Sequence, residues 1–161
     1  MTIRDATPAD LPQINALYNA TIVNSHISFD VEPWDLETRE RWWTQRDVEL
    51  VCLVAADELD VLGVAYSSWW RPKEAYRTSM ETTIVLADTH RGRGLGTELL
   101  GALTERLRDE GVHRAVAIIA LPNDASVALH RSLRYREVGT LTEIGNKLGR
   151  YWDTLVMERA L

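Results

Sequence analysis

The spacing of apolar residues divides the chain into segments with the period of a helix and segments with the period of a strand. A helix is predicted over residues 7–23, with Thr7 as its cap and Pro8 in its first turn. Its apolar residues recur at intervals of three and four: Leu11, Ile14, Leu17 and Tyr18. Residues 35–46 predict a second helix, acidic at its start and basic at its end, as the helix dipole favours.

Strand-like and helical segments then alternate through the rest of the chain. Residues 113–121 form a continuous apolar run, typical of a strand buried on both faces, and residues 136–161 predict two strands around a loop that contains glycine and Lys147. The other predicted strands are residues 2–7, 49–57, 61–70 and 78–88, and the other predicted helices are residues 96–111 and 122–135. This order predicts a single domain over residues 1–161 of the α/β class, with a central mixed sheet flanked by helices.

Composition and charge exclude several classes of protein. The chain has 161 residues and a net charge of −6, which argues against a general binder of nucleic acid or of a membrane surface. Apolar runs such as Ala115–Leu121 are far too short to span a bilayer, and the N-terminus lacks the basic-then-apolar order of a signal peptide. The one cysteine, Cys52, excludes an internal disulfide and a metal site of several cysteines. We therefore expect a cytoplasmic globular protein without a nucleic-acid or membrane partner.

The segment from Thr89 to Leu100, THRGRGLGTELL, combines three glycines and two arginines between a predicted strand and a predicted helix. The unpaired N–H groups and the dipole of a helix start favour an anion, and glycine lets the backbone approach a ligand without a Cβ in the way. Arg91 and Arg93 add groups that bind phosphate through charge-assisted hydrogen bonds. The segment therefore predicts a pyrophosphate site, and the alternative is a glycine-rich turn with solvated arginines.

Two common nucleotide motifs do not fit this segment. A P-loop ends in Gly-Lys-Ser or Gly-Lys-Thr, but Gly96 is followed by Thr97 and Glu98. The dinucleotide fingerprint requires a third glycine three positions after its second, and this position, counted from Gly94, is Thr97. The fingerprint also normally follows the first strand of its unit, whereas this segment follows about the fourth.

Arg91, Gly94 and Gly96 instead match the pattern of arginine or glutamine, two residues, glycine, one residue, and glycine or alanine. With these residues the chain resembles the Gcn5-related N-acetyltransferase (GNAT) superfamily, in which this pattern is the acetyl-CoA signature. The strand before the segment and the strand and helix after it follow the family's order, so the resemblance spans essentially the whole chain. It implies the GNAT acyl-CoA N-acyltransferase fold, with a central mixed, largely antiparallel sheet, and acetyl-CoA as co-substrate without a metal.

Separated segments narrow the resemblance to the phosphinothricin and methionine sulfoximine N-acetyltransferase branch: IRDATPADLPQINALYNATIVNSHISF, AYRTSMETTIV, LPNDASVALHRSL and GNKLGRYWD. The branch implies transfer of acetyl, by direct attack on the thioester, to the α-amine of a small amino acid or glutamate analogue, commonly in a homodimer. Arg134 departs from the family, which usually has glycine before the aromatic residue, and this questions the end of the predicted helix. Tyr151 stands where the branch often has tryptophan, which leaves the choice of substrate open.

The resemblance also implies roles for individual residues. Glu81 matches the family's catalytic glutamate, and His130 matches a histidine beside the thioester that transfers a proton or stabilises the oxyanion; either can be the main base. The residues expected to bind acetyl-CoA are Ile84, Val85, Leu86, Arg91, Gly92, Arg93, Gly94, Leu95, Gly96, Thr97, Asn123 and Ser126. The residues expected to bind the acceptor are Phe29, Arg71, Tyr76 and Lys147. Arg71 suits bidentate capture of a carboxylate, while Lys147 can face the substrate or a partner subunit.

Several of these residues also fit a purely structural role, and the chain also fits two rival functions. Glu81 can be a solvent-facing strand residue, Arg71 can be a solvated loop cation, and Cys52 is expected to be buried packing. The nearest alternative enzyme acetylates a protein N-terminus or a polyamine, and carboxylates in the acceptor pocket would favour the polyamine. A non-catalytic acyl-CoA-binding sensor is the alternative from another class, and the presence of both Glu81 and His130 argues against it.

Overall fold

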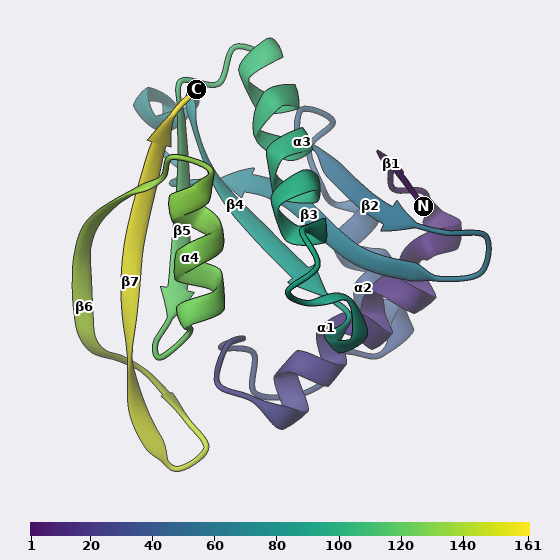
Figure 1. The fold of residues 1–161 in the computed structure, drawn as a ribbon, viewed down its shortest axis with the longest axis horizontal. Helices are drawn as coiled ribbons and strands as arrows, with labels where there is room; N and C mark the ends of the chain where they lie inside the picture. The colour runs from purple at the N-terminus through teal and green to yellow at the C-terminus, as the bar shows by residue number, and fades with distance from the viewer.

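Seven strands of the described chain form one sheet in the order β1-β2-β3-β4-β5-β7-β6 (Figure 1). A computed structural model describes residues 1–161, with the side chain of Asn24 excepted. Its strands are β1 (Thr2–Asp5), β2 (Cys52–Ala56), β3 (Val61–Trp69), β4 (Ser79–Leu86), β5 (Arg114–Ala120), β6 (Arg136–Lys147) and β7 (Arg150–Ala160). β4 and β5 are parallel, and every other neighbouring pair is antiparallel. The predicted fold, a mixed and largely antiparallel sheet flanked by helices, is confirmed.

Four α-helices of the described chain cover the two faces of this sheet: α1 (Leu11–Asn24), α2 (Leu36–Thr44), α3 (Leu95–Asp109) and α4 (Asp124–Ser132). Because successive residues of β2 point to opposite faces, Leu53 and Ala55 pack in one core cluster with α3, whereas Cys52 and Val54 pack in another with α1. α4 packs on β5 and β7 beside α3 (Figure 1). The predicted burial of Cys52 is confirmed. Among the described residues, no helix has both the length and the apolar character needed to cross a bilayer.

β4 and β5 diverge shortly after they meet. Their ladder pairs Ser79–Glu81 with Arg114–Val116, and the described backbone contains no further pair between them. Directly after the last pair, the Oγ1 atom of Thr82 donates a hydrogen bond to the carbonyl oxygen of Val116 at 3.2 Å. The same Oγ1 atom lies 2.9 Å from the hydroxyl oxygen of Tyr135. At Thr82, side-chain hydrogen bonds thus take the place of backbone pairing between β4 and β5, and the two strands separate beyond this residue.

Two sequence expectations need correction in this half of the sheet. β5 is not buried on both faces throughout, because Ile118 is 37 % exposed where it faces the space that opens beside β4. Lys147 is the last residue of β6 rather than part of a loop, and the hairpin turn consists of Leu148 and Gly149. Both turn residues have positive φ, at 54° and 74°, as a two-residue hairpin turn of type I′ requires.

α3 and α4 end in the same left-handed turn with different residues. Gly111 follows α3 with a φ of 85°, as predicted for the end of this helix. Arg134 follows α4 with a φ of 65°, and the N–H of Tyr135 donates to the carbonyl oxygen of His130 at 3.0 Å. The helix end is therefore formed although arginine stands in place of glycine, and this conformation costs a residue with a side chain on the order of 1 kcal/mol.

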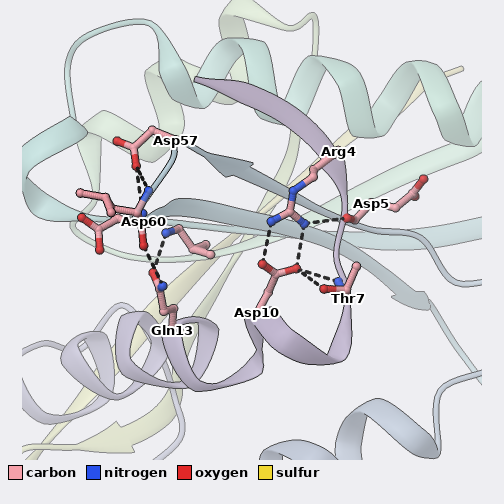
Figure 2. A network of polar contacts seen from close by, with 9 residues as sticks. Arg4, Asp5, Thr7, Asp10, Gln13, Asp57 and Asp60 are labelled. Atoms are coloured by element: carbon pink, nitrogen blue, oxygen red, sulfur yellow. Dashed lines mark hydrogen bonds and ion pairs between the residues drawn. The ribbon is translucent and has the colours of Figure 1, made fainter.

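A polar network joins β1 to the start of α1 (Figure 2). The carboxylate of Asp10 accepts two hydrogen bonds from the guanidinium of Arg4 and one from the N–H of Thr7, each at 2.8 Å. Thr7 and Asp10 form a capping box around the 3-10 turn Pro8–Asp10, which leads into α1. In the same view, Gln13 connects α1 to the turn between β2 and β3 through hydrogen bonds to its backbone. The network fixes where α1 leaves the sheet edge.

We expect Asp10 to make the stability of the chain depend on pH. The hydrogen bonds from Arg4 and then from Thr7 lower the pKa of the Asp10 carboxyl from 3.8 to about 2. Because the folded-state pKa lies below the ordinary value, the stabilisation is complete above roughly pH 4 and is lost as the pH falls toward 2. Asp10→Asn should therefore lower the free energy of unfolding at pH 7 by about 2 kcal/mol, measured by urea denaturation. The exposed Asp5→Asn is the control, and an equal loss in both variants would contradict the prediction.

Candidate active site

A cleft of about 880 Å³ opens where β4 and β5 separate. β4 and the segment that joins it to α3 form one wall, and β5 and α4 form the other; the link between α1 and α2 adds further wall. The predicted site residues that line the cleft are Phe29, Glu81, Ile84, Val85, Leu86, Arg91, Gly92, Gly94, Gly96, Thr97, Asn123, Ser126 and His130. The predicted site residues outside this lining are Arg71, Tyr76, Arg93, Leu95 and Lys147.

The cradle, residues 91–97 between β4 and α3, has a backbone that its glycines allow. Gly92 and Gly94 have φ values of 72° and 86°, which residues with side chains rarely adopt, and Gly94 caps α3. The amides of Thr97 and Glu98 donate to the carbonyl oxygen of Gly94. The N–H groups before them in the first helical turn have no partner within the helix, and unpaired N–H groups at the positive end of a helix are suited to an anion.

Three other cradle residues have different surroundings. Arg91 lines the cleft, and its guanidinium pairs with the carboxylate of Asp88 at 2.9 Å. A Cβ atom at Gly96 would lie 3.1 Å from a leucine of β4 and 3.2 Å from a leucine of α4, so this glycine lets the elements pack closely. The side chain of Leu95 is 4 % exposed and packs in the core, which leaves only its backbone for a ligand.

Glu81 belongs to the last pair of the β4–β5 ladder, where the cleft begins. Met80 and Thr82 point to the face covered by α3 and α4, so Glu81 points to the opposite face, on the side of α1. Burial raises the pKa of the Glu81 carboxyl above its ordinary value, and the positive charge of Arg71 opposes this rise. A carboxylate with a raised pKa in a cleft is suited to accept a proton near neutral pH.

His130 lines the opposite wall from α4 and is 3 % exposed. Its Nδ1 atom lies 2.8 Å from the carbonyl oxygen of Ser126, one helical turn earlier. A carbonyl oxygen only accepts, so Nδ1 carries the hydrogen, and Nε2 of the neutral ring carries a lone pair. Burial lowers the pKa of His130 below its ordinary value, which keeps the ring neutral at pH 7. The Nε2 atom is buried without a hydrogen-bond partner among the described residues and can accept a hydrogen bond or a proton from a bound molecule.

Asn123 and Ser126 lie at the start of α4 on the cleft wall. The Oδ1 atom of Asn123 accepts a hydrogen bond from the N–H of Ser126 at 3.2 Å, so Asn123 caps the helix. This cap uses only the oxygen of the Asn123 side chain. Its NH₂ group remains suited to donate to an amide carbonyl of a ligand that runs along this wall.

The link between α1 and α2 is fastened to the β6–β7 hairpin. The Nζ atom of Lys147, a residue that is 5 % exposed, donates to the carbonyl oxygen of Ser28 at 2.7 Å. His26 stacks on Trp152 with 4.0 Å between the ring centres, and the ring of Phe29 rests against a glycine of β6. Lys147 thus contacts the backbone of the link, and Phe29 is the predicted acceptor residue that reaches the cleft itself.

Arg71 and Tyr76 lie in the exposed segment between β3 and β4. The guanidinium of Arg71 lies 4.4 Å from the centre of the Trp70 ring, and its charge is close enough to Glu81 to lower the pKa of that carboxyl. Tyr76 is 43 % exposed. The structure therefore brings Arg71 near Glu81 and leaves Tyr76 on the surface.

Sequence reasoning misses part of the cleft wall. The residues concerned come from α1, the link, four strands and α4: Tyr18, Thr21, Ile27, Ser28, Asp30, Tyr66, Thr82, Thr83, Ala117, Ile118, Ile119, Ala120, Ala125, Ala128, Leu129, Ser132 and Thr154. The hydroxyls of Tyr18 and Tyr66 are joined by a hydrogen bond of 2.6 Å, and burial raises the pKa of both groups. The sequence pattern places Tyr18 only in the apolar stripe of its helix. The pairing of Tyr66 with Thr83 across β3 and β4 assembles this wall, and no spacing along the sequence reports that pairing.

The chain matches the family model of the Acetyltransferase (GNAT) family over residues 14–135. It is 40 % identical to a phosphinothricin N-acetyltransferase of Streptomyces coelicolor, over 99 % of this chain and 95 % of that protein. It is 41 % identical to an L-methionine sulfoximine/L-methionine sulfone acetyltransferase of Pseudomonas paraeruginosa, over 98 % of this chain and 92 % of that protein.

Two crystal structures are similar along nearly their whole length. A ribosomal-protein-alanine N-acetyltransferase from Brucella melitensis has a TM-score of 0.96 and 40 % sequence identity, and the match covers 100 % of both chains. A GNAT superfamily phosphinothricin acetyltransferase from Sinorhizobium meliloti, in complex with acetyl-CoA, has a TM-score of 0.93 and 35 % identity. That match covers 99 % of this chain and 88 % of the other.

The sheet, the cradle and the cleft between β4 and β5 define an acetyl-CoA-dependent N-acetyltransferase. The chain belongs to the GNAT family of acetyltransferases, which confirms the family predicted from Arg91, Gly94 and Gly96. Acetyl-CoA is its co-substrate. Among the described residues, no three His, Cys, Asp or Glu side chains are grouped as a metal site requires.

Proposed function

We propose that residues 1–161 act as one catalytic domain that transfers acetyl to the α-amine of a small amino acid or glutamate analogue, of the phosphinothricin or methionine sulfoximine type. The observation that carries this proposal is a half-buried Glu81 of raised pKa close to the positive charge of Arg71. Glu81 suits an amine that must lose a proton, and Arg71 suits the carboxylate that an amino acid carries beside that amine. The Streptomyces and Pseudomonas relatives are named for acceptors of this kind.

In the proposed reaction, the amine nitrogen attacks the carbonyl carbon of the thioester directly. The amine arrives mostly protonated at pH 7, and Glu81 accepts this proton directly or through a water molecule. A C–N bond then forms, and the nitrogen of the tetrahedral intermediate still carries a proton that it must lose. As the intermediate collapses, the C–S bond breaks and the sulfur takes up a proton to leave as the thiol of coenzyme A.

The tautomer of His130 favours proton transfer over oxyanion stabilisation. With the hydrogen on Nδ1, the Nε2 atom has none to donate to an oxyanion but can accept a proton. We propose that Nε2 accepts the proton that the nitrogen loses after attack and returns it to the departing sulfur. Glu81 and His130 approach the cleft from opposite faces of the sheet, which suits one proton removed before attack and one removed after it.

The cradle and the separated edge of β4 are proposed to hold acetyl-CoA. The N–H groups of residues 92–96, the backbone of Leu95 among them, suit the pyrophosphate, and Arg91 and Arg93 add charge around it. Beyond Glu81 the backbone of Ile84, Val85 and Leu86 lies along the side of β4 from which β5 has departed. Backbone groups there need partners, and the amides of the pantetheine arm supply them, with Asn123 and Ser126 on the opposite wall.

We further propose that the chain works as a homodimer in the cytoplasm. β6 is an edge strand, and apolar side chains of the β6–β7 hairpin are exposed: Val138, Leu141, Ile144, Leu148 and Tyr151. An exposed apolar edge is a surface that another chain can cover, and a free buried thiol suits a reducing compartment. A monomeric mass in sedimentation equilibrium would contradict the dimer.

A thiol-release assay with acetyl-CoA across a panel of amines tests the proposed function. The panel contains phosphinothricin, methionine sulfoximine, ordinary amino acids, spermidine and an N-terminal alanine peptide. The peptide represents the second candidate, because the Brucella structure is named for protein alanine acetylation. Preference for the glutamate analogues supports the proposal, whereas preference for the peptide or for spermidine replaces it. Acetyl-CoA binding without turnover of any amine would support a sensor.

Arg71→Ala should raise the acceptor KM about tenfold or more and leave acetyl-CoA affinity nearly unchanged, because a charge-assisted contact to the acceptor carboxylate is lost. Arg77→Ala is the matched control. Arg77 lies on the same segment and packs on Trp69 at 4.3 Å from the ring centre, as Arg71 packs on Trp70. Steady-state kinetics with a glutamate analogue measure both variants. Equal KM values for the two variants would remove Arg71 from the acceptor site.

A further inference from the structure

A second hollow, of about 320 Å³, is lined by residues from one end of the sheet. Figure 1 shows this end, where β5 and β6 begin and β7 finishes. The lining residues of the hollow are Arg114, Arg134, Arg136, Glu158, Arg159 and Ala160. They come together because Arg114 pairs with Ala160 across β5 and β7, and Arg136 pairs with Glu158 across β6 and β7. The hollow shares no lining residue with the acetyl-CoA cleft among the residues that the structure describes.

The hollow is also far from the cradle. Arg114 pairs with the first residue of β4, whereas the cradle follows the last residue of that strand. At the rise of a β-strand, the two sites are separated by roughly 20 Å. A phosphate group that binds in the cradle therefore does not reach the hollow.

Four arginines and one glutamate line this hollow. Arg136 forms an ion pair with Glu158, and the Nη1 atom of Arg159 donates to the Oγ1 atom of Thr104 at 3.1 Å. Arg114 and Arg134 form no ion pair with any described residue. Positive charge is therefore in excess here, in a chain whose net charge is −6. An anion that binds among these cations reduces their mutual repulsion.

Arg134 has a backbone conformation that residues with a side chain rarely adopt. Its φ of 65° lies in the left-handed region, where α3 uses Gly111 for the equivalent turn. Strain at a residue with a side chain is a physical reason to look for a function of that side chain. Glycine would form this turn without strain, but it would leave the hollow without the guanidinium of Arg134.

We propose that this arginine hollow binds a small polyphosphate anion at a site separate from acetyl-CoA. Its cationic lining residues are all arginines, and the planar fork of a guanidinium matches the oxygens of a phosphate group and can bind them bidentately. Glu158 pairs with Arg136, so Arg114 and Arg134 are the lining arginines that have no ion pair and can meet the negative charges of such an anion. The volume of the hollow, about 320 Å³, accommodates a pyrophosphate or triphosphate group.

Calorimetric titration of inorganic pyrophosphate into the full chain saturated with coenzyme A tests this proposal. Coenzyme A occupies the cradle, so the titration reports sites outside it. We expect the unchanged chain to bind pyrophosphate saturably and more tightly than inorganic phosphate. Arg134→Gly removes the guanidinium and relieves the strained backbone, so its unfolding temperature without ligand should rise. Its affinity for pyrophosphate should fall at least about tenfold, or 1.4 kcal/mol.

The controls separate a built site from general attraction of anions to the surface. Arg114→Gln, the second variant in the hollow, should also weaken pyrophosphate binding. Arg108→Gln removes an exposed arginine of α3 outside the hollow and should leave pyrophosphate binding unchanged. The proposal is wrong if the unchanged chain does not bind pyrophosphate, if Arg134→Gly binds it with full affinity, or if Arg108→Gln weakens binding as much as Arg114→Gln.

Discussion

Glu81→Gln is expected to lower kcat by on the order of 10²-fold at neutral pH, the low end for a positioned base, with little change in acetyl-CoA affinity. Glutamine keeps the size of the side chain but cannot take a proton from the amine. The variant should fold at least as stably as the unchanged chain, since burial raises the pKa of Glu81 and thus disfavours its charged form. Steady-state kinetics, calorimetry with acetyl-CoA and thermal unfolding measure the three quantities.

The pH dependence distinguishes a base from a residue with only a structural role. A raised pKa means that Glu81 is protonated and inactive over a wider acidic range, so kcat of the unchanged enzyme should fall as the pH drops through that pKa. Glu81→Gln should lack this acidic limb, and its deficit should shrink at high pH, where more of the amine arrives neutral. Full kcat in Glu81→Gln across this range would leave His130 as the leading base. His130→Ala should give a similar but smaller loss.

Gly94→Val is expected to weaken acetyl-CoA binding at least tenfold, or about 1.4 kcal/mol. No described protein atom lies within 4 Å of a Cβ built on Gly94, so the obstruction acts on the ligand side of the cradle rather than on the core. The φ of 86° at this residue adds backbone strain, because a β-branched side chain is an outlier in the left-handed region. Calorimetry with acetyl-CoA measures the affinity.

Gly111→Val is the matched control for that strain. Gly111 has a φ of 85° and, like Gly94, no described atom within 4 Å of a built Cβ, but it lies at the other end of α3. Both variants should lose a similar amount of thermal stability, and only Gly94→Val should lose acetyl-CoA affinity. If Gly111→Val weakens acetyl-CoA binding equally, the effect of Gly94→Val comes from strain in α3 and not from the cradle.

Local signals predict the elements of the fold well, because a cap or a period is formed by neighbouring residues. Gly111 marks the end of α3 as predicted, whereas Thr7 caps the 3-10 turn Pro8–Asp10 and α1 itself begins only at Leu11. The exposure of Ile118 is not predictable from the sequence, because it depends on where β4 leaves β5. That point is marked by the hydrogen bond of Thr82 to Val116, between residues 34 positions apart. The apolar sequence around Ile118 would be the same whether or not β4 remained paired with β5 at that point.

In the candidate site, too, features formed by neighbouring residues can be predicted from the sequence, and features formed by distant residues cannot. Arg91, Gly94 and Gly96 form a motif within six residues, so the cradle can be predicted from the sequence alone. The wall that contains Tyr66 forms only through sheet pairing, and the contact of Lys147 with Ser28 joins distant segments. The sequence reports the chemistry of such residues but not their neighbours. A site formed by one short segment is therefore easier to locate in a sequence than a wall formed by several distant segments.

The hydrogen bond from Lys147 to Ser28 spans 119 residues of the chain. This separation affects the order in which the enzyme becomes complete during synthesis. The link with Ser28 leaves the ribosome long before the β6–β7 hairpin that holds it. It therefore lacks its contact with Lys147 while the rest of the sheet is synthesised. A nascent chain that ends before Lys147 already carries every residue of the cradle, yet it lacks both the anchor for the link and β7, on which β5 and α4 pack. Both walls of the cleft therefore become complete only when the last hairpin of the chain has been made.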